Sequence, residues 1–277
     1  MKKNKFFAIA LLTASVIMTS AFIAPTKITV KGSDTMVILA QRWAELYMKQ
    51  HPETSIQVTG GGSGVGIAAL INVTTDIANS SRSIKPSEIE KLKNRYNTLC
   101  VEIPCAKDGI TIYLNESNKV EELTLQQLSD IYTAKITNWK EVGGADAGIN
   151  LYGRKNSSGT YVYFKENVVK DDYAASCQTL PGTAAVVNAV KKDANGIGYG
   201  GAAYAAGIRH CKVKKDAGSP AYLPTAENIA QNIYPISRYL YMYLRNRPSG
   251  DLKKYIDWIL SPDGQKVVTD IGYFPVK

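Results

Sequence analysis

The chain has 277 residues, 45% hydrophobic and 21% charged, which suits one large domain or two modest lobes and argues against disorder or low complexity. Its formal net charge is +9, and its lysines are scattered rather than clustered. This moderate basic excess favours small anionic partners and argues against nucleic acid as a partner.

The N-terminal segment has the pattern of a secretory signal peptide. Residues 1–5 are basic, residues 6–18 are apolar, and small residues follow at 19–21. We expect cleavage after Ala21, with Ala24 as the latest alternative, which gives a signal peptide at residues 1–21. Without Lys2, Lys3 and Lys5 the mature chain carries +6. No cysteine lies in this segment to carry a lipid anchor, so we expect an exported, soluble, periplasmic protein.

The first third of the chain repeats a strand, a polar loop and a helix. Strands are predicted at residues 27–30, 55–59 and 76–78, and the helices that follow are predicted at 36–50, at 67–71 and from Pro86 onward. This alternation is typical of an α/β fold with a mostly parallel sheet. Ligands of such sheets bind in the loops at the carboxyl ends of the strands, and all three loops are rich in small hydroxyl residues.

The middle and the end of the chain continue the mixed pattern. Residues 99–103 and 109–114 are predicted strands with a break at Pro104, which we interpret as a crossing between two lobes. Residues 234–244 are an apolar, tyrosine-rich strand that makes the return crossing. Helices are predicted at 123–132 with Thr124 as its cap, at 183–191, at 252–260 and at 262–269 with Ser261 as its cap, and further strands at 149–152 and 196–200.

The loop after residues 149–152 has the composition of an anion cradle. Arg154 offers a planar fork of donors, Ser158 and Thr160 add hydroxyl groups, and Gly159 lets the backbone approach closely. The first N–H groups of the helix that follows have no partners within the helix. The alternative is an ordinary serine cap on a surface helix beside a solvated arginine.

Four cysteines in an exported protein suggest disulfides, with three pairings open for Cys100, Cys105, Cys177 and Cys211. Cys100 and Cys105 lie in one predicted strand, which would hold them too far apart to bridge each other. We expect no metal site, since no C-x-x-C spacing occurs.

Catalytic and cofactor motifs are missing from the sequence. A hydrolase of the Ser-His type needs a nucleophile elbow, and the glycine run around Ser63 does not form one. The same run lacks the lysine of a phosphate-binding P-loop, and no acidic residue completes a dinucleotide-binding fingerprint. We therefore expect a protein that is not an enzyme and that needs no cofactor.

Taken together, residues 32–35, 60–64, 76–82, 125–139 and 154–160 resemble the periplasmic phosphate-binding proteins of phosphate ABC importers. The resemblance covers nearly all of the mature chain, and residues 260–265 are similar to solute-binding proteins in general. It implies a type II periplasmic-binding-protein fold, in which two α/β lobes are joined by two hinge crossings and close on phosphate. It also implies lobe I at 26–108 and 228–277, and lobe II at 109–227.

The resemblance further implies a ligand set and partners. The partners would be inorganic phosphate and the membrane permease subunits of an importer, and we expect a monomer. The residues that match the family's site, Asp34 among them as a departure from the family pattern, are Asp34, Thr35, Ser63, Ser81, Arg154, Ser158, Gly159 and Thr160.

Two departures from the family pattern concern charge. Well-known members carry an acid where Ser81 stands, and here Asp34 lies in the first loop instead. We hypothesise that Asp34 accepts the proton of hydrogen phosphate and so rejects sulfate, the alternative being that Asp34 only caps its helix. Asn156 replaces an acid near Arg154, which would leave Arg154 freer for ligand. Arg82 either reaches the site or forms a structural ion pair.

Two other functions stay open. One is the binding of another tetrahedral oxyanion, namely molybdate, tungstate or sulfate. The other is an exported hydrolase or an adhesive surface protein on the same fold, since a fold does not fix a function.

Overall fold

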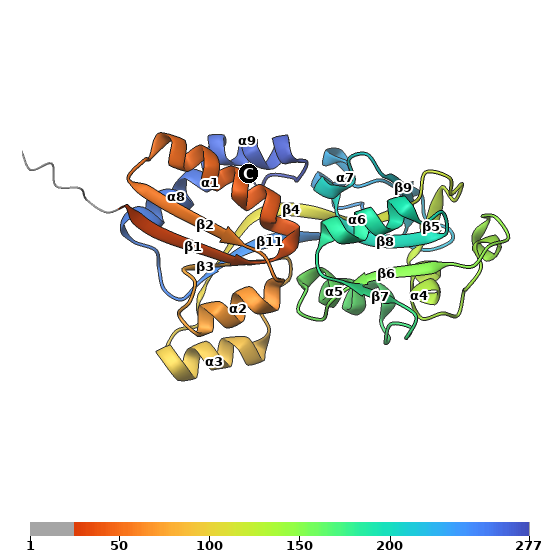
Figure 1. Cartoon of the computed structure of the whole chain (residues 1–277), viewed down its shortest axis with the longest axis horizontal. Helices are drawn as coiled ribbons and strands as arrows, with labels where there is room; N and C mark the ends of the chain where they lie inside the picture. The colour runs from red at the N-terminus through yellow and green to blue at the C-terminus, as the bar shows by residue number, and fades with distance from the viewer. Residues whose placement is uncertain (1–24, 277) are drawn as a thin grey trace, which may run out of the picture.

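A computed structural model describes residues 25–276, so the predicted signal peptide at 1–21 and its cleavage site lie outside the described residues. The strands form one continuous path, β2-β1-β3-β11-β4-β8-β6-β7, with β9, β5 and β10 attached beside it. Helices pack against the two ends of this path, so that the molecule has two separate bodies (Figure 1). The chain therefore has the predicted two-lobed α/β architecture.

The first lobe is a sheet with helices on both faces. β1 pairs in parallel with β2 and β3, and β3 pairs antiparallel with β11. Figure 1 shows α1, α8 and α9 on one face and α2 and α3 on the other. The elements are β1 (Thr26–Gly32), η1 (Asp34–Met36), α1 (Val37–Gln50), β2 (Thr54–Thr59), α2 (Ser63–Ile71), β3 (Ile77–Ser80), α3 (Pro86–Tyr96), α8 (Gly250–Ile259) and α9 (Pro262–Ile271).

The second lobe is a smaller mixed sheet. β8 pairs antiparallel with β4 and in parallel with β6, which in turn pairs in parallel with β7. Its remaining elements are β5 (Glu122–Thr124), α4 (Leu125–Tyr132), η2 (Trp139–Val142), β6 (Asn150–Arg154), α5 (Gly159–Phe164), the π-helical turn η3 (Lys165–Val169), β7 (Gln178–Leu180), α6 (Thr183–Lys192), β8 (Gly196–Gly201), η4 (Ala202–Tyr204), β9 (Arg209–Lys214), β10 (Ala221–Tyr222) and α7 (Ala226–Ala230).

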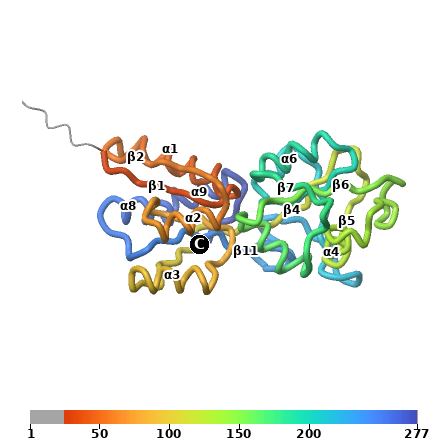
Figure 2. The backbone as a smooth tube through the Cα atoms, turned by 60° about the horizontal axis from the view of Figure 1, so that its bottom comes forward, coloured from red at the N-terminus to blue at the C-terminus, as the bar shows by residue number. Residues whose placement is uncertain are grey.

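Two long strands, β4 (Val101–Leu114) and β11 (Ser237–Leu244), connect the lobes. β4 pairs with β11 up to Gly109 and with β8 from Ile110 onward, so one strand belongs to both sheets. Both strands run between the two bodies in Figure 1, and the rotated view marks β11 where the bodies meet (Figure 2). A short junction of two strands is the kind of connection about which lobes rotate.

The predicted break at Pro104 is wrong. β4 runs without interruption through Pro104, whose partner is Tyr241. The register shifts between Leu240 and Tyr241, which leaves Cys105 without a direct partner as a bulge. Because proline cannot donate a ladder hydrogen bond, a bulge is where a paired strand tolerates it. The change of partner sheet comes five residues later, at Gly109.

Several local predictions are confirmed. Thr124 caps α4 by accepting from the Gln127 N–H, and Ser261 caps α9 by accepting from the Gly264 N–H.

Two elements begin at other residues than predicted. The helix predicted from Ile67 begins earlier, at Ser63, because Gly62 takes φ +99° and turns the glycine run into the helix start. The strand predicted from residue 234 begins at Ser237.

Apolar side chains fill a separate core in each lobe. The first core lies between the first sheet and α1, α8 and α9, and includes Trp43, Tyr47 and Tyr255. The second includes Tyr132, Phe164 and Tyr199. All four cysteines are free thiols, with Cys105 in the first core and Cys211 in the second. The disulfides suggested by the compartment are therefore not formed, and Cys100, at φ +61°, lies just before β4 rather than in it.

Among residues 25–276, no helix is long and apolar enough to cross a membrane.

Candidate functional site

The loops after β1, β2 and β3 meet at one edge of the first lobe. Ser33 Oγ donates to Ser81 Oγ at 2.9 Å, and Ser63 Oγ accepts from the Ser81 N–H at 3.0 Å. All three residues are at most 2% exposed. The carboxyl ends of parallel strands lie at the same edge of a sheet, so three loops far apart in sequence supply adjacent hydroxyl groups.

The loop after β6 brings the second lobe against this edge. Ser158 caps α5 by accepting from the Tyr161 N–H at 3.3 Å, as the alternative of an ordinary serine cap expected. Gly159 and Thr160, the first residues of α5, are buried rather than on the surface. The loop is therefore both a helix cap and part of a buried contact between the lobes.

Contacts across the cleft are close. Thr35 Oγ1 and Thr160 Oγ1 lie 2.8 Å apart, and the Gly64 N–H donates to the Ser157 carbonyl at 2.9 Å. A Cβ at Gly159 would lie 2.3 Å from Ser63 Oγ, which only glycine avoids. The lobes are thus closed on each other in this structure. The eight residues predicted for the site all lie in this cleft or on the loops that border it.

Arg154 lies in the contact between the two lobes with a side chain that is 1% exposed. Its Nη1 donates to Thr183 Oγ1 at 2.8 Å and its Nη2 to Asp34 Oδ2 at 2.6 Å. Burial lowers the pKa of the Arg154 guanidinium, and the Asp34 carboxylate acts in the opposite direction. We expected Asn156, in place of an acid, to leave Arg154 freer for ligand. Arg154 is nevertheless paired with a carboxylate, that of Asp34 in the first loop.

One of the three guanidinium nitrogens of Arg154 makes no hydrogen bond within residues 25–276. Nε is buried and has no hydrogen-bond partner among the described residues. An unpaired buried N–H of a charged group costs about 1–3 kcal/mol or more, so the arrangement favours an acceptor at this position. An oxyanion oxygen fits that demand.

Asp34 does not cap its own helix. No side-chain cap bond is made at the start of η1, and Asp34 Oδ1 instead accepts from the Gly61 N–H at 2.8 Å. Asp34 therefore ties the first loop to the second loop through one oxygen and to Arg154 of the other lobe through the other. The capping alternative is not what the structure shows.

Sequence reasoning missed a second buried guanidinium. Arg238 of β11 forms an ion pair with Asp108 of β4 at 2.7 Å, and both side chains are at most 2% exposed. Arg238 is the one charged residue in the apolar run 234–244, and a charge in such a strand needs a partner. This isolated charge in an apolar strand is the sequence feature that could have identified Arg238 as a buried, paired residue. Thr183, which holds Arg154, gave no comparable signal.

Arg82, left open by the sequence, pairs with Glu88 through both terminal nitrogens, at 2.9 and 2.7 Å. Three arginines in or near the cleft are thus each matched to one carboxylate, Arg154 to Asp34, Arg238 to Asp108 and Arg82 to Glu88. The site therefore offers directed N–H and O–H donors rather than a net positive charge. Such donors select an anion by geometry.

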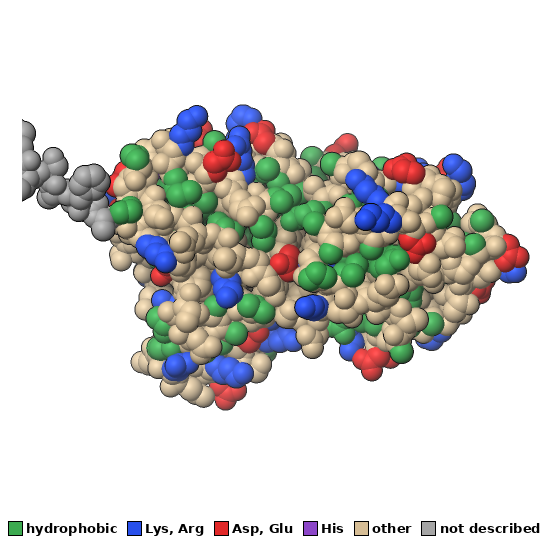
Figure 3. All heavy atoms as spheres, in the orientation of Figure 1, with side chains coloured by type: hydrophobic (Ala, Val, Ile, Leu, Met, Phe, Trp, Pro, Cys, Tyr) green, Lys and Arg blue, Asp and Glu red, His purple; other side chains and the backbone are tan. Residues whose placement is uncertain are grey.

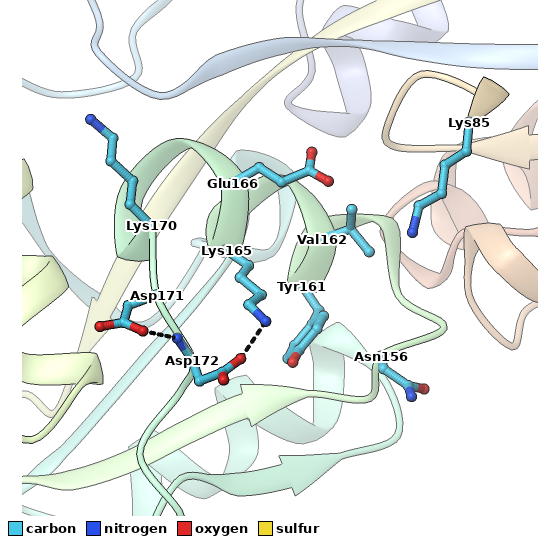
Figure 4. Close-up of a pocket in the computed structure, with 9 residues that line it drawn as sticks. All are labelled: Lys85, Asn156, Tyr161, Val162, Lys165, Glu166, Lys170, Asp171 and Asp172. Atoms are coloured by element: carbon cyan, nitrogen blue, oxygen red, sulfur yellow. Dashed lines mark hydrogen bonds and ion pairs between the residues drawn. The ribbon is translucent and has the colours of Figure 1, made fainter. Parts of the chain in front are cut away.

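A hollow of about 860 Å³ lies between Lys85 of the first lobe and residues of α5 and η3 in the second. Figure 4 shows Lys85 facing α5 and η3 across this space, where Lys165 is bonded to Asp172 at 2.6 Å. Its lining holds three lysines and three acids, so it presents no field of one sign. The visible face in Figure 3 likewise mixes basic and acidic side chains, which does not suit a nucleic-acid surface.

Among residues 25–276, no group of three or more His, Cys, Asp or Glu side chains is placed to hold a metal ion.

Comparisons with known proteins agree with this geometry. The family described as the PBP superfamily domain matches residues 19–263. The chain is 32% identical over 263 residues to a phosphate-binding protein PstS of Pseudomonas aeruginosa, covering 88% of this chain and 81% of that protein. It is 31% identical over 254 residues to that of Bacillus subtilis, with 91% and 82% covered.

Solved structures give the same picture. A phosphate-bound structure from Clostridium perfringens, assigned to phosphate ABC transport as a substrate-binding protein, superposes with a TM-score of 0.83 at 31% identity and covers 91% of this chain and 100% of that one. An ABC-type phosphate transport receptor from Vibrio cholerae superposes with a TM-score of 0.71 at 30% identity, covering 89% and 99%. The similarity therefore spans both lobes.

Proposed function

Because the chain belongs to the PBP superfamily and, within it, to the PstS phosphate-binding proteins, we propose that it captures inorganic phosphate between its lobes and delivers it to an ABC importer. This family consists of substrate-binding proteins of transporters and is not an enzyme family. The observation that carries the proposal is the buried Nε of Arg154, which has no hydrogen-bond partner among the described residues although Nη1 and Nη2 of the same side chain are bonded to Thr183 and Asp34.

The proposed ligand set is the one expected from the sequence. Arg154 supplies Nε, and the buried hydroxyl and N–H groups of the surrounding loops supply the remaining donors. Phosphate has four oxygens to satisfy, and backbone and hydroxyl donors at a helix start suit them. The residues proposed to bind are Asp34, Thr35, Ser63, Ser81, Arg154, Ser158, Gly159 and Thr160.

Asp34 is proposed to select hydrogen phosphate over sulfate. Its two oxygens accept from the Gly61 N–H and from Arg154, which leaves further lone pairs on the carboxylate. Hydrogen phosphate carries a proton that such an acceptor can take, whereas sulfate carries none at neutral pH. A carboxylate facing sulfate would therefore repel it.

The expected bounds are 26–108 and 228–277 for the first lobe and 109–227 for the second. We propose moving the return to the first lobe from residue 228 to Ser237, so that the second lobe spans 109–236. Supporting this return point, Ile229, Tyr234 and Ile236 pack in the second core. We also propose export by a signal peptide at residues 1–21, a periplasmic location, a monomeric state, binding to permease subunits of an importer, and no catalytic activity.

The test is isothermal titration of the mature protein, dialysed free of anions, with phosphate at neutral pH. We expect tight binding of one phosphate per chain that sulfate and molybdate do not displace. If the protein prefers sulfate, molybdate or tungstate, its ligand is that oxyanion and not phosphate. Turnover of phosphate esters by the same preparation would contradict the receptor function.

A further inference from the structure

Arg238 and Asp108 lie directly opposite each other where the two lobes join. They are register partners in the antiparallel pair of β11 and β4, so their side chains project from the same face of the crossing. Arg238 Nε and Nη2 lie 3.1 and 2.7 Å from Asp108 Oδ2. Asp108 Oδ1 accepts from the Ala202 N–H at 3.0 Å, which fixes the carboxylate.

The remaining donors of Arg238 reach both sides of the cleft. Nη1 donates to the Ser81 carbonyl at 2.8 Å, in the third loop of the first lobe. Nη2 also donates to Thr160 Oγ1 at 3.0 Å, in the second lobe. If the lobes rotate apart about the crossings, at least one of these two distances must lengthen. Both bonds together are therefore a property of the closed arrangement.

The contact with Thr160 also determines where a proton points. A guanidinium has only donors, so the Thr160 hydroxyl must accept from Arg238 and cannot direct its proton there. Thr35 and Thr160 share a further hydrogen bond at 2.8 Å, which uses one of their two protons. The other proton is left free to donate to a third acceptor, and an anion bound between the lobes would supply one.

We propose that Arg238 is a positioning residue for anion capture, which orients the Thr35–Thr160 hydroxyl pair as a donor toward the ligand and does so only when the lobes are closed. The inference rests on the proposed function, since it assumes an anion between the lobes. Arg238 acts through Thr160 rather than by touching the ligand. Closure and ligand recognition thus share one side chain at the hinge.

A double-mutant cycle between Arg238→Lys and Thr160→Val tests this. Lysine keeps the charge but cannot reach Asp108, Ser81 and Thr160 together. We expect each single variant to weaken phosphate binding about tenfold or more, chiefly through faster dissociation, as loss of a charge-assisted hydrogen bond would do. The double variant is expected within about twofold of Thr160→Val alone, because both changes remove the same interaction.

The matched control is Arg245→Lys. Arg245 follows β11 directly and donates to the carbonyls of Leu70 and Thr75, which both belong to the first lobe. It is expected to lower Tm without changing phosphate affinity. If Arg238→Lys does not fold, Arg238→Gln replaces it in the same cycle, since its amide oxygen accepts the Thr160 proton and turns it from the cleft.

Three results would overturn the inference. Additive effects of Arg238→Lys and Thr160→Val would show that the two residues act independently. Unchanged phosphate affinity in Arg238→Lys with a lowered Tm would show a purely structural ion pair. Absence of phosphate binding by the wild-type protein would instead refute the proposed function, and the positioning role with it.

Discussion

Asp34 Oδ2 lies 2.6 Å from Arg154 Nη2, although 120 residues separate the two side chains in sequence and they belong to different lobes. The side chain of Asp34 is 18% exposed and that of Arg154 is 1% exposed, so the ion pair has Asp34 on its solvent side and Arg154 on its buried side. One acid thereby neutralises the buried arginine and links the two lobes.

Asp34→Asn is expected to lose selectivity. The amide no longer repels sulfate and no longer neutralises Arg154, so the ratio of sulfate to phosphate affinity should rise by about tenfold or more. Competition titrations of phosphate against sulfate measure this ratio. Asp76→Asn is the control, because Asp76 accepts from the N–H and hydroxyl of Thr29 within the first lobe. An Asp34→Asn protein that still rejects sulfate would refute the selector role.

Gly159→Ala is expected to weaken phosphate capture without unfolding the protein. Its new Cβ would lie 2.3 Å from Ser63 Oγ and 2.7 Å from Ser81 Oγ, so the lobes could not close fully. We expect phosphate affinity to fall by about ten- to hundredfold, as overpacking of a tight contact costs about 1–3 kcal/mol. Tm should hardly change, because alanine suits a helix start.

Gly148→Ala is the matched control for that variant. A Cβ at this exposed position would meet nothing closer than the Thr137 carbonyl at 3.9 Å. It should bind phosphate as the wild type does. Equal affinities for the two alanine variants would show that the contact of α5 with Ser63 and Ser81 plays no part in capture.

The buried tyrosines and Cys177 should make the protein less stable at alkaline pH. Burial raises the pKa of Tyr204 to about 12 and that of Cys177 to about 11, and raises the pKa of Tyr113 and Tyr273 well above the ordinary value. A raised pKa favours the neutral group in the fold. The contribution of these phenols to the free energy of unfolding is therefore fully present below their pKa in the unfolded chain, which is about 10. It is lost as the pH rises through their higher pKa values in the folded protein.

Tm measured as a function of pH, together with the ultraviolet absorbance of tyrosinate, checks this expectation. Tm should be level up to about pH 9 and then fall as tyrosinate forms on unfolding. Tyrosine titration complete near pH 10 in the folded protein would contradict the burial of these phenols.

The thiols should be free in the oxidising compartment proposed for the protein. Cys105 and Cys211 are buried in different cores, and Cys100 and Cys177 are partly covered, so denatured protein without reductant should titrate as four thiols. Reductant should leave Tm unchanged, since no disulfide constrains the unfolded chain. Fewer thiols, or a lower Tm with reductant, would show a disulfide that the structure lacks.

The sequence by itself determined the features that depend on neighbouring residues. The alternation of strands, polar loops and helices predicted the parallel strands β1, β2 and β3 of the first lobe, and the geometry of such strands placed Thr35, Ser63 and Ser81 at one edge. Caps at Thr124 and Ser261 were likewise predictable, because a helix start is satisfied by side chains within three residues of it.

Only the tertiary structure decided how the lobes meet. Arg154 meets its partner Asp34 only because the two lobes close on each other, and Arg238 meets Asp108 because β11 pairs with β4 in this register. The identity of neither partner can be read from the residues that are near in sequence. Tertiary structure likewise decided the setting of Pro104, which a bulge in β4 accommodates, and the separation of Cys105 from Cys211, which lie in different cores. Local chemistry supplies the donors, and the relative position of two separately folded bodies determines which acceptor each one meets.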